Sequence, residues 1–405
     1  MHQALSTMPA LTGSLDTDEN ALAWAAHDYG DTVHDRPTAV LRPANVPDIS
    51  TVIKHAGEHQ LAVVPRGQGH STSGQAQAPG GVVIDMTALS AIHEVRPDHV
   101  VVDAGAKWSD VLRATLPHGL TPPVLTDYLE LTVGGTLSVG GLGGASHHHG
   151  AQTDNVLSLD VVTPTGDVVT CSPSSNRAVF DAVRAGRGRN GVITRATLRL
   201  VQAPETVAWH KLHYDSIGQF VADQRQLVTT GTFDYVEGQL KIRDGKHVAE
   251  LEAVTFIGTS SGSGNLGGLS FREAETQAVS YWEFVDRLAP GEPVLREAGF
   301  WESPHPWCNL LVPRASVEDL LHHADRELGA DLYSDFGLVL AYPLRADRIT
   351  TPLLRLPDDD LVFLVAALRY APSASPKIVT AMHEANGRLV NKTLAARGTL
   401  YLDPL

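Results

Sequence analysis

Six glycines lie in the segment from 134 to 144, and this density constrains the fold more than any other feature of the chain. Apolar residues alternate with these glycines, as in VGGTLSVGGLGG, which favours a buried segment over a flexible surface loop. A buried glycine segment lets the backbone approach a ligand closely, and the hydroxyl groups of Thr132 and Ser138 add hydrogen-bonding groups. The segment therefore predicts one wall of a ligand-binding site.

A second glycine-rich segment, RGQGHSTSGQ, covers residues 66–75 and follows an apolar run that is typical of a strand. Gly67, Gly69 and Gly74 allow sharp turns that aim backbone N–H groups at an anion, and His70 lies inside the loop. Taken alone, such a pattern is more often a tight turn with a surface histidine. The segment lacks the marker of a nicotinamide-type Rossmann site and that of a P-loop. Together, the two uncharged loops indicate one large ligand that carries a pyrophosphate.

Hydrophobic periodicity divides the chain into two parts, each with helices and strands. The first part includes a helix within 45–60, for which Asp48 is a candidate N-cap, and a hairpin within 155–172. The pattern changes at a candidate linker, residues 203–205. Beyond the linker, five apolar strands and two amphipathic helices predict a sheet covered by helices. We therefore predict an α+β fold with one domain at 1–204 and a second at 205–405.

Charge and composition argue against several classes of function. The net charge is −15, from 31 Lys and Arg against 46 Asp and Glu, which disfavours binding to nucleic acid. No run approaches the 18 apolar residues of a membrane span, and the acidic N-terminus lacks a secretory pattern, so we expect a cytoplasmic protein. Cys171 and Cys308 form no metal-type pair, and an extended His147–His149 segment would point its side chains to opposite faces. We expect no metal site.

The motifs resemble those of the FAD-binding oxidoreductases of the vanillyl-alcohol oxidase (PCMH-type, berberine-bridge) superfamily, and most of all those of the cytokinin dehydrogenase family. The resemblance extends from about Arg36 to near the C-terminus. Its motifs are RGQGHSTSGQAQAPGGVVIDM, LTDYLELTVGGTLSVGG, HGAQTDNVLSLDVVTPTGDVVTCS, GVITRATL, FDYVEG, PHPWCNLLVP and DLVFLVAALRY. The order and spacing of these motifs are far more specific than any single one.

The resemblance implies a two-domain PCMH-type FAD-binding fold and roles for matching positions. His70 would bond covalently to the isoalloxazine ring of FAD. Asp127 would be the catalytic acid–base beside the cofactor, and Glu252 would be a carboxylate of the catalytic pocket. Trp307 and Asn309 would line the substrate entrance. The other cofactor-binding residues that the resemblance implies are Gly67, Gln68, Gly69, Ser71, Gln75, Thr132, Ser138, Leu142, Ile193 and Tyr401.

The implied reaction oxidises a small-molecule secondary amine, such as an N6-isoprenoid adenine, to an imine that hydrolyses to adenine and an aldehyde. Desolvation beside apolar residues such as Leu125 and Leu129 would strengthen the Asp127 carboxylate as a base, although an isolated aspartate is more often a turn residue. The electron acceptor would be oxygen or a quinone. The alternatives are a flavin oxidase of an alcohol or a biosynthetic intermediate, and a catalytically silent flavin-binding protein.

The chain departs from the family pattern at its C-terminus. Tyr401 and Leu402 match the point at which relatives turn back toward the flavin domain, and the further returning segment is missing after Leu405. The second domain is therefore expected to lack the family's C-terminal return to the flavin domain.

Overall fold

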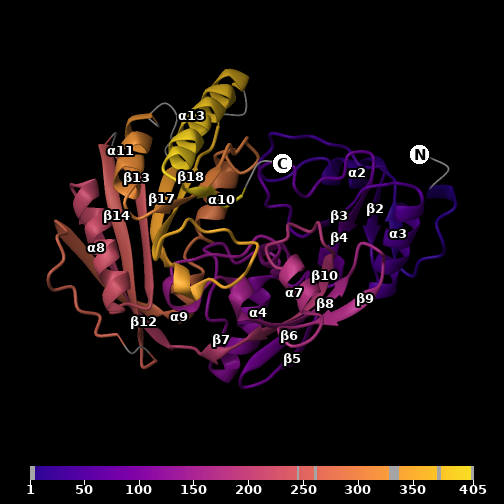
Figure 1. The fold of residues 1–405 in the computed structure, drawn as a ribbon, viewed down its shortest axis with the longest axis horizontal. Helices are drawn as coiled ribbons and strands as arrows, with labels where there is room; N and C mark the ends of the chain where they lie inside the picture. Colours follow the sequence, from indigo (N-terminus) through magenta and orange to yellow (C-terminus); the bar gives the residue numbers. More distant parts are fainter. Residues whose placement is uncertain (1–4, 244–245, 260–261, 328–336, 372–374, 403–405) are drawn as a thin grey trace.

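The computed structural model describes residues 5–243, 246–259, 262–327, 337–371 and 375–402. In Figure 1 two parts lie side by side, with the N-terminal sheets on the right and a large sheet with its helices on the left. Helices and strands are mixed in both parts, so the predicted α+β class is confirmed.

Two small sheets form most of the N-terminal part. In the first, β2 (Ala39–Arg42) and β3 (Val63–Arg66) flank β4 (Val82–Asp85) in parallel, and β1 (Ser14–Asp16) pairs with β2. The second sheet is antiparallel, in the order β5 (Ile92–Val95), β6 (His99–Asp103), β10 (Val192–Arg199), β8 (Val156–Val162) and β9 (Val168–Cys171). A short pair joins β7 (Leu120–Thr121) to β11 (Val201–Gln202). The helices are α2 (Glu19–Ala25), α3 (Val46–Glu58), α4 (Trp108–Thr115), α5 (Val133–Leu137), α6 (Ser146–His149) and α7 (Arg177–Val183).

The start of α3 differs from the prediction. Asn45 is the N-cap, and its side chain accepts the Asp48 backbone N–H at 3.1 Å. The Asp48 carboxylate instead accepts backbone N–H groups of Thr12, Gly13 and Ala44 at 2.8, 2.9 and 2.9 Å. Asp48 therefore ties the N-terminal segment to the helix, a long-range contact with no local sequence signal.

An antiparallel sheet of eight strands dominates the rest of the chain. Its spatial order is β15 (Glu273–Ser280), β12 (Thr206–Tyr214), β14 (Lys246–Ile257), β13 (Tyr235–Arg243), β17 (Leu338–Arg345), β18 (Leu361–Leu368), β16 (Cys308–Pro313) and β19 (Thr399–Leu400). The five predicted strands of this part are present. The strand β15 was missed because its residues, EAETQAVS, are polar and mostly exposed at the edge of the sheet.

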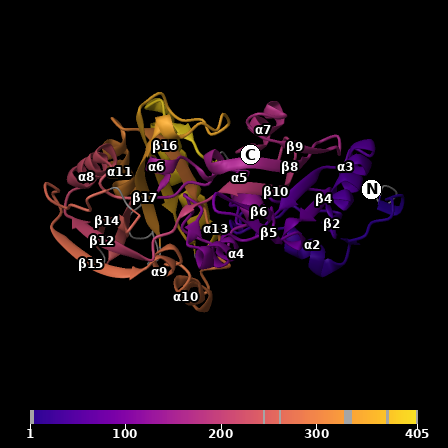
Figure 2. The same cartoon turned by 90° about the horizontal axis from the view of Figure 1, so that it is seen from below.

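The eight-stranded sheet is buried on both faces at β18. Alternate residues of β18, Phe363 and Val365, pack into the core shared with the helices, whereas Val362 and Leu364 pack on the opposite face with Leu142 of the N-terminal part. Burial on both faces explains the uninterrupted apolar run LVFLVAAL. Figure 2 shows the same arrangement from below. The helices of this part are α8 (Ile217–Thr230), α9 (Tyr281–Val285), α10 (Gly291–Glu297), α11 (Val317–Glu327) and α13 (Pro376–Ala395).

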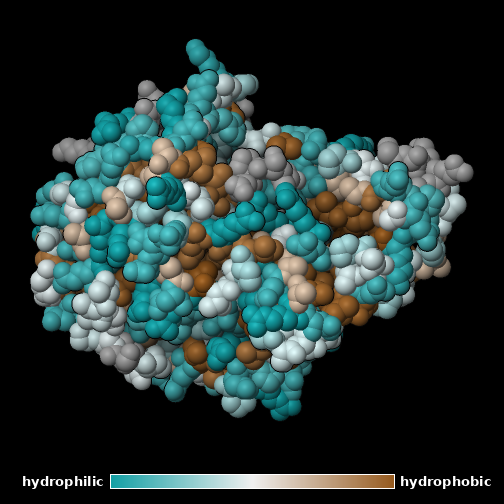
Figure 3. Space-filling model, viewed as in Figure 1, coloured by the Kyte–Doolittle hydropathy of each residue, from teal (hydrophilic) through white to brown (hydrophobic). Residues whose placement is uncertain are grey.

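The break between the sheets falls between Gln202, the end of β11, and Thr206, the start of β12. One hydrophobic core nevertheless continues across the break, because Val207 and Trp209 of β12 join the core of the N-terminal part. The division into domains at 204 and 205 stays a prediction. In Figure 3 hydrophobic residues reach the surface in the middle of the molecule, where the two parts meet. Among the described residues, no helix has the length and apolar character to cross a membrane.

Candidate active site

The loop that carries His70 follows β3 and is held by a buried carboxylate. Asp28 accepts hydrogen bonds from Ser71 Oγ at 2.9 Å and from the backbone N–H groups of Gly74 and Gly30 at 2.8 and 3.1 Å. Burial raises the pKa of Asp28, and these three donors oppose the rise. Gly74 has a φ of 77°, which glycine adopts without strain. Asp28, which the sequence analysis did not identify, therefore fixes the path of the loop.

His70 lies in a cluster of aromatic side chains. Its ring stacks on Tyr29 with centroids 3.9 Å apart, and it lies 5.1 Å from Tyr128 and 5.9 Å from Trp307. Burial lowers the pKa of His70 to about 3, and the neighbouring His305 contributes to this lowering. The imidazole is therefore uncharged at neutral pH, and one of its ring nitrogens carries a lone pair.

The two glycine-rich segments contact each other at Gly67 and Thr132. A Cβ on Gly67 would lie only 2.0 Å from Thr132 Oγ1, so a larger residue does not fit there. Thr132 is the N-cap of α5, and its Oγ1 accepts the Gly135 backbone N–H at 3.3 Å. At the other end of α5, Ser138 Oγ donates to the Gly134 carbonyl at 2.7 Å. The two predicted hydroxyl residues thus lie at the ends of one short helix.

The later part of the glycine-rich segment packs on the eight-stranded sheet. Leu142 is buried in a cluster that includes Leu364 of β18. The hydroxyl of Tyr401 accepts the Gly141 backbone N–H at 3.1 Å, and the Tyr401 backbone N–H donates to the Asn309 carbonyl at 3.1 Å. Burial raises the pKa of Tyr401 to about 12, so the hydroxyl stays protonated. Tyr401 therefore links the sheet to the glycine-rich segment.

The remaining predicted cofactor residues differ in their surroundings. Gln75 accepts the Ser73 backbone N–H at 2.9 Å, Ile193 is buried in β10, and Gln68 is exposed. In the described part of the chain, the backbone N–H groups of residues 68–72 donate to no other residue. Consecutive free N–H groups in a glycine-rich loop fit an anionic group such as a pyrophosphate.

Asp127 belongs to a buried cluster of charged side chains that joins the two parts of the chain. Arg287 Nη2 donates to Asp127 Oδ1 at 2.9 Å, and Arg287 Nε donates to Glu252 Oε2 at 3.0 Å. A third carboxylate, that of Glu237, lies 3.6 Å from Arg287 Nη2. The Tyr235 hydroxyl lies 2.8 Å from Asp127 Oδ1 and 2.7 Å from Glu237 Oε2. The structure thus places Asp127 and Glu252 in one cluster.

The cluster contains an excess of acidic groups, because three carboxylates share the Arg287 guanidinium. Burial raises the pKa of Glu237 well above its usual range, and the neighbouring Asp127 adds to this effect. Burial also raises the pKa of Glu252, although Arg287 opposes it. Burial disfavours the charge of Arg287, but Tyr235 and the carboxylates outweigh burial and raise its pKa. The cation is therefore permanent, whereas burial favours the protonated forms of Glu237 and Glu252.

A small pocket adjoins this cluster. Asp127, Tyr235 and Arg287 line it together with apolar side chains that include Leu125, Phe256, Tyr281, Phe284 and Val285. The Asp127 side chain is 19% exposed, compared with 7% for Glu237 and 9% for Glu252. Asp127 is therefore the most accessible carboxylate of the cluster.

The residues predicted at the substrate entrance lie in two places. Trp307 lies beside His70, and its indole Nε1 is buried without a hydrogen-bond partner among the described residues. Asn309 is in β16, where its carbonyl accepts the backbone N–H of Tyr401. Tyr128 directly follows Asp127 and lies against the His70 ring, so the His70 loop and the Asp127 cluster are neighbours.

The three consecutive histidines lie in the short helix α6, not in the extended segment that the sequence analysis assumed. His147 Nδ1 lies 2.8 Å from the Gly144 carbonyl oxygen, and its Nε2 lies 3.2 Å from that of Phe233. Burial lowers the pKa of His147 to about 3. His147 therefore connects the glycine-rich segment to the residues that lead into β13.

The sequence is similar to known protein families and to individual proteins. Residues 37–172 match a model described as "FAD binding domain", and residues 204–266 and 264–401 match "Cytokinin dehydrogenase 1, FAD and cytokinin binding". Cytokinin dehydrogenase 10 of Oryza sativa subsp. japonica is 37% identical, over 89% of this chain and 75% of that protein. The chain belongs to the FAD-binding cytokinin dehydrogenase family.

Further relatives cover most of the chain. "Uncharacterized oxidoreductase ORF5 in fasciation locus" of Rhodococcoides fascians is 40% identical, over 96% of this chain and 90% of that protein. Cytokinin dehydrogenase 2 of Arabidopsis thaliana is 32% identical, over 94% of this chain and 83% of that protein. The chain is thus an FAD-dependent oxidoreductase, as predicted, while the roles of its individual site residues stay predictions.

We expect Arg287→Met to destabilise the fold by about 3–5 kcal/mol, because it leaves a cluster of acidic side chains without its buried cation. The double variant Arg287→Met/Glu252→Gln should recover part of the lost stability, because it removes one of the negative charges that repel one another. Arg113→Met is a matched control, since its ion pair with Asp110 is exposed and should contribute at most about 0.5 kcal/mol. Chemical denaturation measures all four proteins. Equal stability of Arg287→Met and Arg113→Met would contradict the expectation.

Proposed function

We propose that this oxidoreductase oxidises a secondary amine, such as an N6-isoprenoid adenine, to an imine that water splits into adenine and an aldehyde. The observation that carries the proposal is the placement of Asp127, an accessible carboxylate held by Arg287 and Tyr235 in a mostly apolar pocket. The plant relatives are named cytokinin dehydrogenases, which supports this class of substrate.

Asp127 would act as the base. Its Oδ1 is engaged by Arg287 and Tyr235, whereas its Oδ2 accepts no hydrogen bond from another described residue. Oδ2 is therefore available to the N–H group of a substrate, whose proton it would take as the C=N bond forms. FAD, when bound, supplies the acceptor for the hydride that leaves the neighbouring carbon. The apolar lining of the pocket would exclude water and strengthen these electrostatic contacts.

FAD would be held by both glycine-rich segments. The free N–H groups of residues 68–72 suit its pyrophosphate, and His70 offers a neutral ring nitrogen for a covalent bond to the isoalloxazine. The two segments lie in contact, as one extended ligand requires. The other residues that we propose in cofactor binding are Gly67, Gly69, Ser71, Gln75, Asp127, Thr132, Ser138, Leu142, Ile193 and Tyr401, with Gln68 at the exposed rim.

We expect His70→Ala to abolish covalent attachment of FAD. Mass spectrometry of the denatured protein should show the added mass of FAD in the parent and none in the variant. His118→Ala, at an exposed histidine, should keep the added mass. Retention of the flavin mass in His70→Ala would mean that another residue forms the bond.

We expect Asp127→Asn to slow flavin reduction by the amine by about 10²–10⁴-fold, the usual contribution of general acid–base catalysis. The flavin should stay bound, because asparagine has nearly the shape of aspartate. Stopped-flow absorbance measures the rate, with Asp110→Asn as a control at an exposed aspartate. An unchanged rate in Asp127→Asn would remove this residue from the mechanism.

A further inference from the structure

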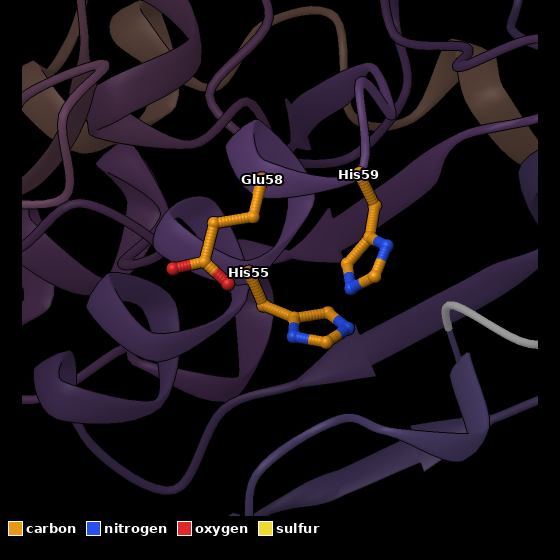
Figure 4. Close-up of side chains that lie close together, drawn as sticks. All are labelled: His55, Glu58 and His59. Atoms are coloured by element: carbon orange, nitrogen blue, oxygen red, sulfur yellow. The ribbon is translucent and has the colours of Figure 1, made fainter.

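Three metal-ligating side chains lie together at the C-terminal end of α3, outside the site described above. His55, Glu58 and His59 occupy positions i, i+3 and i+4, which share one face of a helix. One ligand atom from each residue lies within 4.8 Å of the other two. Figure 4 shows that the Glu58 carboxylate and the His59 ring both extend toward the imidazole of His55.

The surroundings of this cluster favour a cation. His55 is only 5% exposed and so is held in place, whereas Glu58 and His59 are exposed and can adjust. The two imidazole rings are close, with centroids 4.4 Å apart. The cluster lies at a helix C-terminus, where the last carbonyl groups carry a partial negative charge.

We propose that His55, Glu58 and His59 bind a divalent transition-metal ion such as Zn²⁺. Imidazole and carboxylate ligands at about 2.0–2.2 Å from zinc lie about 3–3.5 Å from one another, which rotations of Glu58 and His59 can reach. Three protein ligands leave the fourth position to water. The cysteines and the histidines at 147–149 predicted no metal site, and His55, Glu58 and His59 lie apart from them in sequence.

Calorimetric titration of the FAD-loaded, metal-free protein with ZnCl₂ tests this site. We expect one Zn²⁺ per chain, binding at least tenfold weaker in His59→Ala and in Glu58→Ala, and unchanged binding in His118→Ala. Both substitutions fall on exposed side chains, so the variants should fold. An absence of binding, or equal affinity in the parent and His59→Ala, would overturn the proposal.

A second inference comes from the protons around Tyr235, and it rests on the proposed role of Asp127. The Tyr235 hydroxyl accepts a hydrogen bond from Arg287 Nη2 at 2.6 Å. It also contacts two carboxyl oxygens, Asp127 Oδ1 at 2.8 Å and Glu237 Oε2 at 2.7 Å. A phenol has one proton to donate. One of the two carboxyl groups must therefore carry a proton, because two oxygen lone pairs would otherwise face each other.

The contacts locate that proton on Glu237. Asp127 accepts a charged hydrogen bond from Arg287 at 2.9 Å, whereas the Glu237 carboxylate lies 3.6 Å from the same nitrogen. Asp127 is also more exposed, at 19% against 7%, so water stabilises its charge better. Burial and the charge of Asp127 both raise the pKa of Glu237, in agreement with this assignment.

We propose that Glu237 is a neutral carboxylic acid at pH 7 and acts as a positioning residue for Asp127. Glu237 donates its proton to the Tyr235 hydroxyl, and Tyr235 donates its own proton to Asp127 Oδ1. Asp127 thereby keeps its negative charge, because the single Arg287 cation does not have to balance three negative charges. Its second oxygen, Oδ2, stays available to the substrate.

Infrared spectroscopy of the substrate-free protein tests this proton directly. We expect the carbonyl band of a protonated carboxyl group at pH 7 in the parent. The band should be lost in Glu237→Gln and kept in Glu252→Gln, because Glu252 accepts a charged hydrogen bond from Arg287. If Glu237→Gln does not fold, a parent without this band at pH 7 would overturn the proposal by itself.

Stability gives a second readout. The folded-state pKa of Glu237 lies above its usual 4.5, so its contribution to stability is full below about pH 4.5 and is lost as the pH rises through the folded pKa. Glu237→Gln is neutral at every pH and should therefore gain stability relative to the parent as the pH rises. The groups that face Glu237 are Tyr235, Asp127, Arg287, Glu252 and, from β17, Tyr342.

Chemical denaturation between pH 4 and pH 9 measures this difference. A difference that does not change with pH, together with an infrared band that survives Glu237→Gln, would overturn the inference. Neither readout requires turnover, so a failure here is distinguishable from a failure of Asp127 as the catalytic base.

Discussion

The interaction of Arg287 with three carboxyl groups, those of Asp127, Glu237 and Glu252, is the one on which the site depends. Its partners come from distant parts of the chain, since Asp127 lies 160 positions and Glu252 lies 35 positions from it in sequence. Burying carboxylates without a cation costs several kcal/mol each, so the cluster forms only when the Asp127 loop, β13, β14 and the end of α9 come together. The guanidinium therefore couples assembly of the fold to assembly of the site.

Close backbone approach is the second constraint, and it connects the cofactor segments to this cluster. Gly67 lies against Thr132, which joins the two glycine-rich segments. A Cβ on Gly144 would lie 2.5 Å from the Tyr235 ring, so the same segment also rests on the Arg287 cluster. One glycine-rich segment thus has the proposed cofactor site on one side and the proposed base on the other.

Features carried by local patterns could be predicted from the sequence. The strands of the large sheet follow from apolar runs, and both glycine-rich segments stand out by composition. Arg287 could not be found in this way. The segment around it, DRLAPGEP, has no hydrophobic periodicity, and the partners of Arg287 are distant in sequence. Asp28 was missed because two of its partners, Ser71 and Gly74, lie 43 and 46 positions away in sequence. The cap at Asn45 was missed because Asp48 offered an equally good local pattern.

The measurement that tests the account most directly compares two substrates that share an isoprenoid group. The yellow protein is mixed anaerobically with an N6-isoprenoid adenine or with the corresponding isoprenoid alcohol, and the visible absorbance of the flavin is followed. We predict rapid bleaching by the amine, with one adenine and one aldehyde formed per flavin, and little bleaching by the alcohol. Rapid bleaching by the alcohol, with none by the amine, would contradict it.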